Sequence, residues 1–337
     1  MSVPTRTLSL SDIEALAQSA LEAAGATPAN AAPLARATAA TEADGVASHG
    51  LAYIPIYCEH LRCGKVDGQA RPVMTRPAPG LVRVDAAHGF AHGAIDLGFA
   101  ALTEAARTQG IAGLAIHRSY NCGVLGVHTT RLAEDGLLAI GATNAPASIA
   151  PSGGARPLVG TNPISMAAPG PDGPRLVIDQ SASTIAKSEV MKHAREGRKI
   201  PLGWALDAEG NPTDDPAVGL KGSMAPAGGY KGVGLALIVE MLAAALTGAT
   251  LGKDASPFSG PVGGPPATGQ FFIAIDPGAA SDGAFDARMA DLMAAAAGDP
   301  GARLPGANRA AKRAAAARDG VAVAQATLDK IAASMGG

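Results

Sequence analysis

The hydrophobic pattern of this chain changes near residue 80. Before that point apolar residues recur at the spacing of amphipathic helices. We predict a first helix that ends at Gly25, a second from Pro28 to about Glu42, and a third that stops at Gly64. The motif SDIE at residues 11–14 is typical of a capping box that starts the first helix. The N-terminal part of the chain therefore reads as a helical unit.

From Leu81 onward, strand-like and helix-like segments alternate. Strand patterns occupy residues 81–86, 111–119, 137–145, 163–169, 175–180 and 269–276. Helix patterns occupy residues 93–109, 124–135, 183–197, 231–247, 285–297 and 308–335. This alternation predicts an α/β fold, with helices packed on a sheet. Residues 207–216 have turn composition, and the Gly/Pro-rich stretch 256–268 is typical of a lid or a site wall.

Composition excludes several classes of protein. The net charge is −2 and aromatic residues make up 3%, so there is neither a basic stripe nor a stacking surface for nucleic acid. No apolar run reaches the roughly 18 residues that span a membrane, and the first residues lack a signal-peptide core. The three cysteines have no CxxC spacing, which disfavours a disulfide scaffold and a zinc site. We expect no metal and a reducing cytoplasmic location.

The usual nucleotide-binding motifs are absent. The sequence GxGxxG fails because Leu237 stands at the third glycine, and a P-loop fails because Asp254 stands where Ser or Thr is required. Three other glycine-rich or polar loops remain, at residues 147–163, 179–187 and 228–234. The last opens a predicted helix and carries Lys231, a combination that can bind an anion. A solvated lysine is the alternative reading.

One histidine is placed for chemistry. His49 lies in a Ser-His-Gly turn ahead of the third predicted helix. An imidazole has an ordinary pKa near working pH, so a histidine on such a turn can present a proton donor to a cleft. From the local sequence alone, a helix cap or a surface histidine remains the alternative.

Several motifs taken in order resemble the malate/L-lactate dehydrogenase-2 family. They are DGVASHG, NAPASIAPSGGARPLVGTNPISMAAP, IDQSAS, GWALDAEGNPTDDP, GGYKGVGLALIVEMLAAALTGA and TGQFFIAIDP. The resemblance implies an NAD(P)-dependent oxidoreductase, using NADPH or NADH, without a Rossmann domain. It implies a mostly antiparallel sheet in residues 79–299 and a helical domain from residues 1–78 with 300–337. It also implies a homodimer.

The resemblance assigns roles to individual residues. His49 matches the acid/base, Asp179 the site aspartate, and Ser48 a contact to substrate or nicotinamide. Thr161 is similar to a substrate-contacting threonine. The positions that match cofactor contacts are Gln180, Ser181, Ala182, Ser183, Lys187, Tyr230, Lys231, Pro305 and Gly306.

Two positions depart from the family pattern. Asn121 stands where some relatives have a histidine, and an amide cannot transfer a proton near neutral pH. Tyr53 stands where many have an arginine, and a phenol cannot bind a substrate carboxylate in a bidentate manner. Arg156 or Lys187 could supply that cation, although plain surface charge is the alternative for both.

The sequence thus leads to three hypotheses. The first is an oxidoreductase that interconverts a small 2-oxo acid and its 2-hydroxy acid, with His49 as acid/base. The second is a reductase of cyclic ketimines, such as piperideine-2-carboxylate or pyrroline-2-carboxylate, to cyclic amino acids. The third is an inactive binding protein that kept the fold. The presence of His49, Asp179 and Lys231 together disfavours the third.

Overall fold

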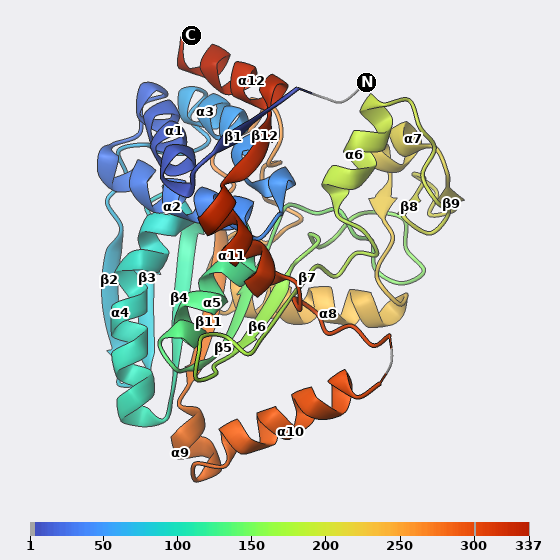
Figure 1. Cartoon of the computed structure of the whole chain (residues 1–337). Coiled ribbons are helices and arrows are strands. Elements are labelled where there is room, and N and C mark those ends of the chain that lie inside the picture. The colour runs from blue at the N-terminus through green and yellow to red at the C-terminus, as the bar shows by residue number, and fades with distance from the viewer. Residues whose placement is uncertain (1–3, 300, 337) are drawn as a thin grey trace.

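The computed structural model describes residues 4–299 and 301–336. Figure 1 shows a seven-stranded sheet with helices on it, beside a helical region built from both ends of the chain. The strand order is β2-β3-β4-β11-β5-β6-β7. Only β3 and β4 pair in parallel within this sheet, and the other neighbours are antiparallel. The predicted mostly antiparallel sheet is therefore confirmed.

The strands lie close to their predicted positions. Their bounds are β2 Val73–Ala78, β3 Leu81–Asp85, β4 Ile111–Ser119, β5 Leu138–Thr143, β6 Ile164–Ala168, β7 Leu176–Gln180 and β11 Thr268–Ile275. β2 has no predicted counterpart. Its residues are mostly exposed, so it lacks the apolar alternation that identifies a half-buried strand.

Helices cover both faces of the sheet. α4 (Ala91–Gln109) and α5 (Leu125–Glu134) pack on one face, where Leu114 and Phe272 belong to the largest buried cluster. On the other face, Ala142 packs against Val239 of α8 (Tyr230–Glu240) and Ala243 of the π-helical turn Met241–Ala245. Alternation along each strand separates these two sets of side chains.

The helical region joins the two ends of the chain. It contains α1 (Leu10–Ala23), α2 (Pro28–Ala43), α3 (Ile54–Arg62), α11 (Arg309–Asp319) and α12 (Gln325–Met335). β1 (Thr5–Leu8) pairs antiparallel with β12 (Val321–Ala324), and the two lie side by side in Figure 1. The expectation of one helical segment over 308–335 is wrong, because this strand pair interrupts it.

The start of α1 also corrects a prediction. Ser9 is the N-cap, its Oγ accepts the Asp12 N–H at 3.1 Å, and the Asp12 carboxylate accepts the Ser9 N–H at 3.3 Å. The capping box thus lies two residues before the predicted SDIE motif. Either Asp or Glu can supply the carboxylate at the third helical position. The sequence therefore allows a capping box that starts at Ser9 as well as one that starts at Ser11.

A smaller unit follows β7. It contains α6 (Lys187–Arg195), α7 (Pro216–Lys221) and a short sheet of β8 (Ala205–Leu206), β9 (Pro212–Thr213) and β10 (Ser223–Met224). The expected start of α6 near Ser183 is wrong, because residues 182–184 instead hydrogen-bond with Thr161, Ala225 and Pro226. The expected surface loop 207–216 contains β9 and a turn held by the Asp207 carboxylate.

Two further helices, α9 (Pro277–Ser281) and α10 (Phe285–Ala297), lie at the lower edge of Figure 1, and neither has a buried residue. Within the described part of the chain, no helix is both long enough and apolar enough to cross a membrane. The same residues contain no group of three His, Cys, Asp or Glu side chains placed to hold a metal ion. Cys58, Cys63 and Cys122 are free.

Candidate active site

A cavity of about 480 Å³ lies where the helical region meets the end of β7. Its wall contains segments that are far apart in sequence: the turns after α2, the start of α5, the loops at 145–148 and 161–163, the stretch 179–191, residues 257–259, and Arg309. The volume lies in the range of small-molecule sites. The Gly/Pro-rich stretch 256–268 supplies Pro257, Phe258 and Ser259, so it forms a site wall as predicted.

His49 reaches this cavity from a turn rather than from a helix start. It ends the 3₁₀ turn Ala47–His49, and a second turn, Leu51–Tyr53, separates it from α3. The buried Glu42 carboxylate accepts the Leu51 N–H at 2.7 Å and fixes the segment. Gly50, directly after His49, packs against the same carboxylate: a Cβ there would stand 2.2 Å from Glu42 Oε1, so any side chain would displace Glu42. Because the turn Leu51–Tyr53 separates His49 from α3, His49 does not cap that helix.

Among the described residues, the His49 ring has one side-chain hydrogen bond. Its Nδ1 lies 3.0 Å from Ser48 Oγ, and the ring stacks parallel to Tyr53 with centroids 6.3 Å apart. Burial lowers the pKa of His49, while the charge of Asp179 acts in the opposite direction. Ser48 itself is exposed and does not line the cavity.

Asp179 faces the same cavity from the end of β7. Its Oδ2 accepts the Gly126 N–H at 2.8 Å, at the N-terminus of α5, and lies 3.5 Å from Arg309 Nη2. Burial raises the pKa of Asp179, and the Gly126 N–H, Arg309 and His49 all oppose that rise. A carboxylate at a helix N-terminus is a favourable arrangement. The structure thus brings together a histidine and an aspartate that each shift the other's pKa.

Five other predicted site residues line the cavity: Tyr53, Thr161, Gln180, Ser181 and Lys187. Tyr53 donates its hydroxyl proton to the Phe258 carbonyl at 3.1 Å, and burial raises its pKa to about 12. The Lys187 side chain is exposed to solvent at its end of the cavity, yet the surrounding chain lowers its pKa by desolvation. No charged neighbour contributes to that shift.

The remaining predicted residues lie outside the cavity wall. Asn121 Oδ1 accepts the Tyr57 hydroxyl at 2.9 Å and the Gly123 N–H at 3.2 Å, so it orders the loop before α5. Ala182 and Ser183 are buried in backbone pairing, and Arg156 is exposed. Also exposed are Tyr230 and Lys231 at the start of α8, and Pro305 and Gly306 ahead of α11.

Sequence reasoning missed Arg309 and the apolar part of the wall. The apolar contributors include Val46, Ile56, Val124, Leu125 and Met191. Three of the chain's four tyrosines, Tyr53, Tyr57 and Tyr120, form edge-to-face contacts with one another or with Phe90 beside the cavity. Because the chain has so few aromatic residues, the occurrence of tyrosines at positions 53, 57 and 120 could have indicated an aromatic cluster near the site.

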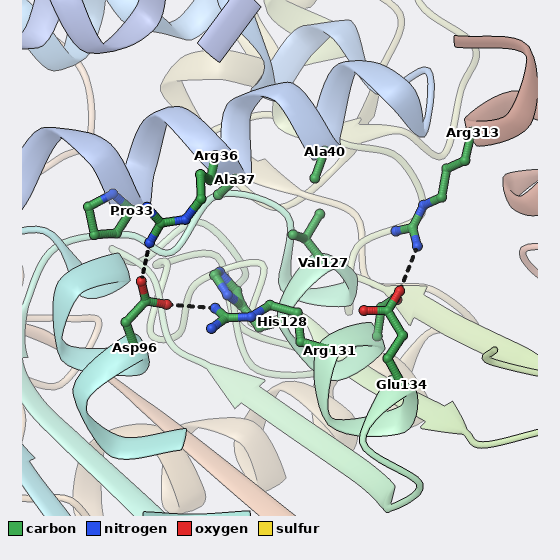
Figure 2. Close-up of a pocket in the computed structure, with 11 residues that line it drawn as sticks. Pro33, Arg36, Ala37, Ala40, Asp96, Val127, His128, Arg131, Glu134 and Arg313 are labelled. Atoms are coloured by element: carbon green, nitrogen blue, oxygen red, sulfur yellow. Dashed lines mark hydrogen bonds and ion pairs between the residues drawn. The ribbon is translucent and has the colours of Figure 1, made fainter. Parts of the chain in front are cut away.

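A second, smaller cavity of about 210 Å³ lies between α2, α4, α5 and α11. Figure 2 shows Asp96 between Arg36 and Arg131, at 2.6 and 2.8 Å, and Glu134 beside Arg313 at 3.7 Å. None of the predicted site residues lines it. Its charged side chains are partnered with one another, and they join helices from different parts of the chain.

The wall of the larger cavity carries the kinds of groups that bind a cofactor or a small carboxylate substrate. Gln180, Ser181, Ser188 and Thr161 offer amide and hydroxyl groups along one wall, and Lys187 offers a positive charge. Val46, Ile56 and Leu125 offer apolar surface for a planar ring. A few polar groups on a mostly apolar wall are what a cofactor site requires.

Comparisons with known proteins agree with this geometry. The sequence model of the family described as malate/L-lactate dehydrogenase matches residues 8–332. The chain is 45% identical over 311 residues to (2R)-3-sulfolactate dehydrogenase (NADP(+)) of Chromohalobacter salexigens, covering 92% of each chain. It is 39% identical over 336 residues to Delta(1)-pyrroline-2-carboxylate reductase of Ancylobacter novellus, covering 99% of this chain and 98% of the relative.

The fold comparison gives the same result. The crystal structure of delta1-piperideine-2-carboxylate reductase from Pseudomonas syringae pvar. tomato superposes with a TM-score of 0.91 at 36% identity, covering 98% of this chain and 100% of that one. The fold and cavity define a non-Rossmann, NAD(P)-dependent oxidoreductase that uses NADPH or NADH. The chain belongs to the malate/L-lactate dehydrogenase family.

Proposed function

We propose that the cavity around His49 and Asp179 is the active site, and that it transfers hydride between nicotinamide and a small 2-oxo acid or its 2-hydroxy acid. One observation carries this proposal: His49 and Asp179 come from different regions of the fold, line one cavity and shift each other's pKa. Perturbed titratable groups in a cleft are typical of active sites.

The proposed roles follow from charge. The bound nicotinamide supplies the hydride for reduction. Hydride addition leaves negative charge on the substrate oxygen, and protonated His49 neutralises it by donating its proton. With Ser48 on Nδ1, the other ring nitrogen, Nε2, is the one we assign to proton transfer. Asp179 favours the positively charged imidazolium of His49 before that donation.

We assign cofactor contacts to Gln180 and Ser181 on the cavity wall at the end of β7, and to the neighbouring Ala182 and Ser183, which lie behind that wall. Tyr230, Lys231, Pro305 and Gly306 remain proposed cofactor contacts, although they lie outside the cavity wall. Gly306 lies against β7, since a Cβ there would stand 2.4 Å from the Val177 carbonyl oxygen. NADPH is the proposed preference, because the sulfolactate dehydrogenase relative is named for NADP(+).

The substrate carboxylate needs a cation in place of the missing arginine at Tyr53. Of the two candidates, Lys187 lines the cavity, whereas Arg156 does not. Of its two predicted roles, cofactor contact and carboxylate partner, we therefore assign Lys187 the second, with the Thr161 hydroxyl as a further contact to the carboxylate. Arg309 also lines the cavity, but Asp44 and Asp179 already occupy its guanidinium.

A second candidate function is reduction of a cyclic ketimine. Such a substrate carries one carboxylate and a ring of methylene groups. The cavity has an apolar section of Tyr53, Ile56 and Phe258 beside His49, which suits that ring. The pyrroline-2-carboxylate reductase relative spans nearly the whole chain, which also supports this candidate.

A substrate panel separates the two candidates. We would follow oxidation of NADPH and NADH separately, with pyruvate, sulfopyruvate, pyrroline-2-carboxylate and piperideine-2-carboxylate. Turnover of an oxo acid supports the first proposal. Turnover of the ketimines alone would replace the first proposal with ketimine reduction. No turnover of either substrate class by an enzyme that binds NADPH would contradict both proposals.

We also propose a homodimer in the cytoplasm. Apolar side chains of α8 and of the π-helical turn after it face solvent: Ile238 and Met241 are 47% and 58% exposed. A second copy of the chain is the proposed cover, since a run of exposed apolar side chains marks a surface that is buried in an assembly. Light scattering after gel filtration tests the dimer, and Met241→Glu should dissociate it.

The three free cysteines suit a reducing compartment such as the cytoplasm, which cell fractionation would test.

A further inference from the structure

A chain of charged groups leads from the wall of the larger cavity into α11. Arg309, the first residue of α11, places Nη2 at 3.5 Å from Asp179 Oδ2 and Nη1 at 3.4 Å from Asp44 Oδ2. The Asp44 side chain, just after α2, is fully buried. Arg313, one turn along α11, also binds Asp44, with Nη2 at 3.1 Å, and its ion pair with Glu134 points to the second cavity (Figure 2).

We propose that Arg309 is a positioning residue for the reaction: it keeps Asp179 ionised beside His49, and buried Asp44 holds Arg309 in place. This inference rests on the roles proposed above for His49 and Asp179. It makes a residue from the far end of the sequence part of the acid/base machinery, although Arg309 itself has no assigned contact with the reacting atoms.

The packing around the ion pair leaves little freedom. At Gly126 in the first turn of α5, a Cβ would stand 2.6 Å from Arg309 Nη1 and 2.7 Å from Asp179 Oδ2. The Gly126 N–H already donates to that same carboxylate oxygen. The absence of a side chain at position 126 therefore lets the guanidinium and the carboxylate meet on the helix end.

The charges around Asp179 show what Arg309 contributes. The groups that face it are Arg309 from α11, His49 from its turn, the Gly126 N–H of α5 and the Cys122 thiol. Burial raises the pKa of Cys122 to about 12, so that thiol is neutral near pH 7. His49 changes charge during the proposed reaction, whereas a guanidinium stays positive. Arg309 thus opposes protonation of Asp179 throughout the cycle.

Loss of Arg309 should raise the pH at which Asp179 takes up a proton. Burial pushes the pKa of Asp179 upward, and Arg309 pushes it down. Without Arg309 the carboxylate takes up a proton at a higher pH, and a neutral carboxyl group gives His49 no ionic support. The acidic limb of the rate profile should therefore move upward in pH.

The test compares two arginines on one helix. We would measure kcat and kcat/KM against pH for wild type, Arg309→Gln, Arg309→Lys and Arg313→Gln. Arg309→Gln should move the acidic limb up by roughly 1–3 pH units, the usual effect of an opposite charge within a few ångströms. Arg309→Lys keeps the charge, so its limb should stay near the wild-type position while kcat falls. Arg313→Gln should leave the limb unchanged.

A second variant removes no charge. Gly126→Ala should separate Arg309 from Asp179 by inserting one methyl group, lowering kcat and moving the limb in the same direction, with little change in the KM for NADPH. Gly234→Ala is its control, because Gly234 is also helical and a Cβ there meets nothing within 4 Å. This pair of variants keeps the test available if Arg309→Gln does not fold.

The outcomes separate the two proposals. Equal profiles for Arg309→Gln and Arg313→Gln, or a Gly126→Ala enzyme with the wild-type profile, would overturn the positioning role and leave only helix docking. Wild-type rates in a His49→Ala enzyme would instead overturn the proposed acid/base, whatever the arginine variants do.

Discussion

The two cavities differ in how their charged groups are partnered. In the smaller one, Asp96 binds Arg36 and Arg131, and Glu134 binds Arg313. In the larger one, Arg309 is paired with Asp44 and Asp179. Lys187 forms no ion pair with any residue that the structure describes, and the side-chain hydrogen bond of His49 is to Ser48. Both cavities contain histidine, cations and, at their edges, residues of α11.

This contrast shows why charge alone does not identify a site. Mutually paired ions mainly join the helices on which they lie. A cation and a histidine that line a cavity without a carboxylate bonded to them are available to a ligand. Substitutions in the two cavities should therefore affect different quantities: turnover and KM in the larger one, stability in the smaller one.

Replacing His49 by alanine should give the largest loss. We expect kcat to fall about 10²–10⁴-fold, the usual contribution of a general acid. Stopped-flow or steady-state turnover measures the rate, and fluorescence titration with NADPH should show a nearly unchanged Kd. A Kd that weakens in proportion to the rate would instead place His49 in cofactor binding.

The histidine of the smaller cavity should govern stability rather than rate. His128 is fully buried, and burial lowers its pKa to about 4. Between pH 6.5 and 4 the unfolded chain binds a proton that the folded chain excludes, so stability falls as pH falls, by about 3 kcal/mol for a shift of this size.

The variant His128→Gln isolates that contribution. Wild type should be more stable than the variant near pH 7, and the difference in unfolding free energy should shrink as the pH approaches 4. Urea titrations at several pH values measure it. Parallel stability curves would show that His128 takes no part in the acid response.

Lys187 and Arg156 provide a matched pair of cations. Lys187→Met should raise the KM for the carboxylate substrate about tenfold, since a hydrogen bond to a charged group contributes roughly 1.5 kcal/mol at the low end of its range. Arg156→Gln removes an exposed cation outside the cavity and should leave KM unchanged. The reverse pattern would assign the carboxylate to Arg156.

The smallest effect should come from Asp96→Asn. Its arginine partners are 52% and 42% exposed, and such pairs stabilise a fold by about 1 kcal/mol or less. Thermal unfolding should therefore show a small decrease in Tm, with kcat and KM unchanged. A large loss of kcat would show that the smaller cavity also serves the reaction.

Much of the sheet region was predictable because its strands are buried and apolar. β4, β5 and β11 carry continuous apolar runs, and each was placed within a few residues. β1 and β12 were missed, because each has four residues and is recognisable only with its partner, more than 300 positions away in sequence. Local periodicity contains no information about such a pairing.

The candidate site was likewise predicted only in part. His49 and Asp179 were assigned through motifs that resemble a known family, and the structure places both on one cavity. Arg309 was not assigned, because the alanine-rich helix around it resembles any exposed helix. Its function depends on a buried aspartate, Asp44, from the opposite end of the chain, which the sequence does not place beside it.

The pairing of β1 with β12 sets an order on synthesis. A ribosome makes Thr5–Leu8 early, and this strand waits without its partner until Val321–Ala324 have been translated. Arg309 is likewise translated after every other residue that lines the active-site cavity. A nascent chain stopped between Asp179 and α11 would carry His49 and Asp179 but lack the cation between Asp179 and Asp44. Late translation of these segments thus delays completion of the proposed proton-transfer site until the two ends of the chain have met.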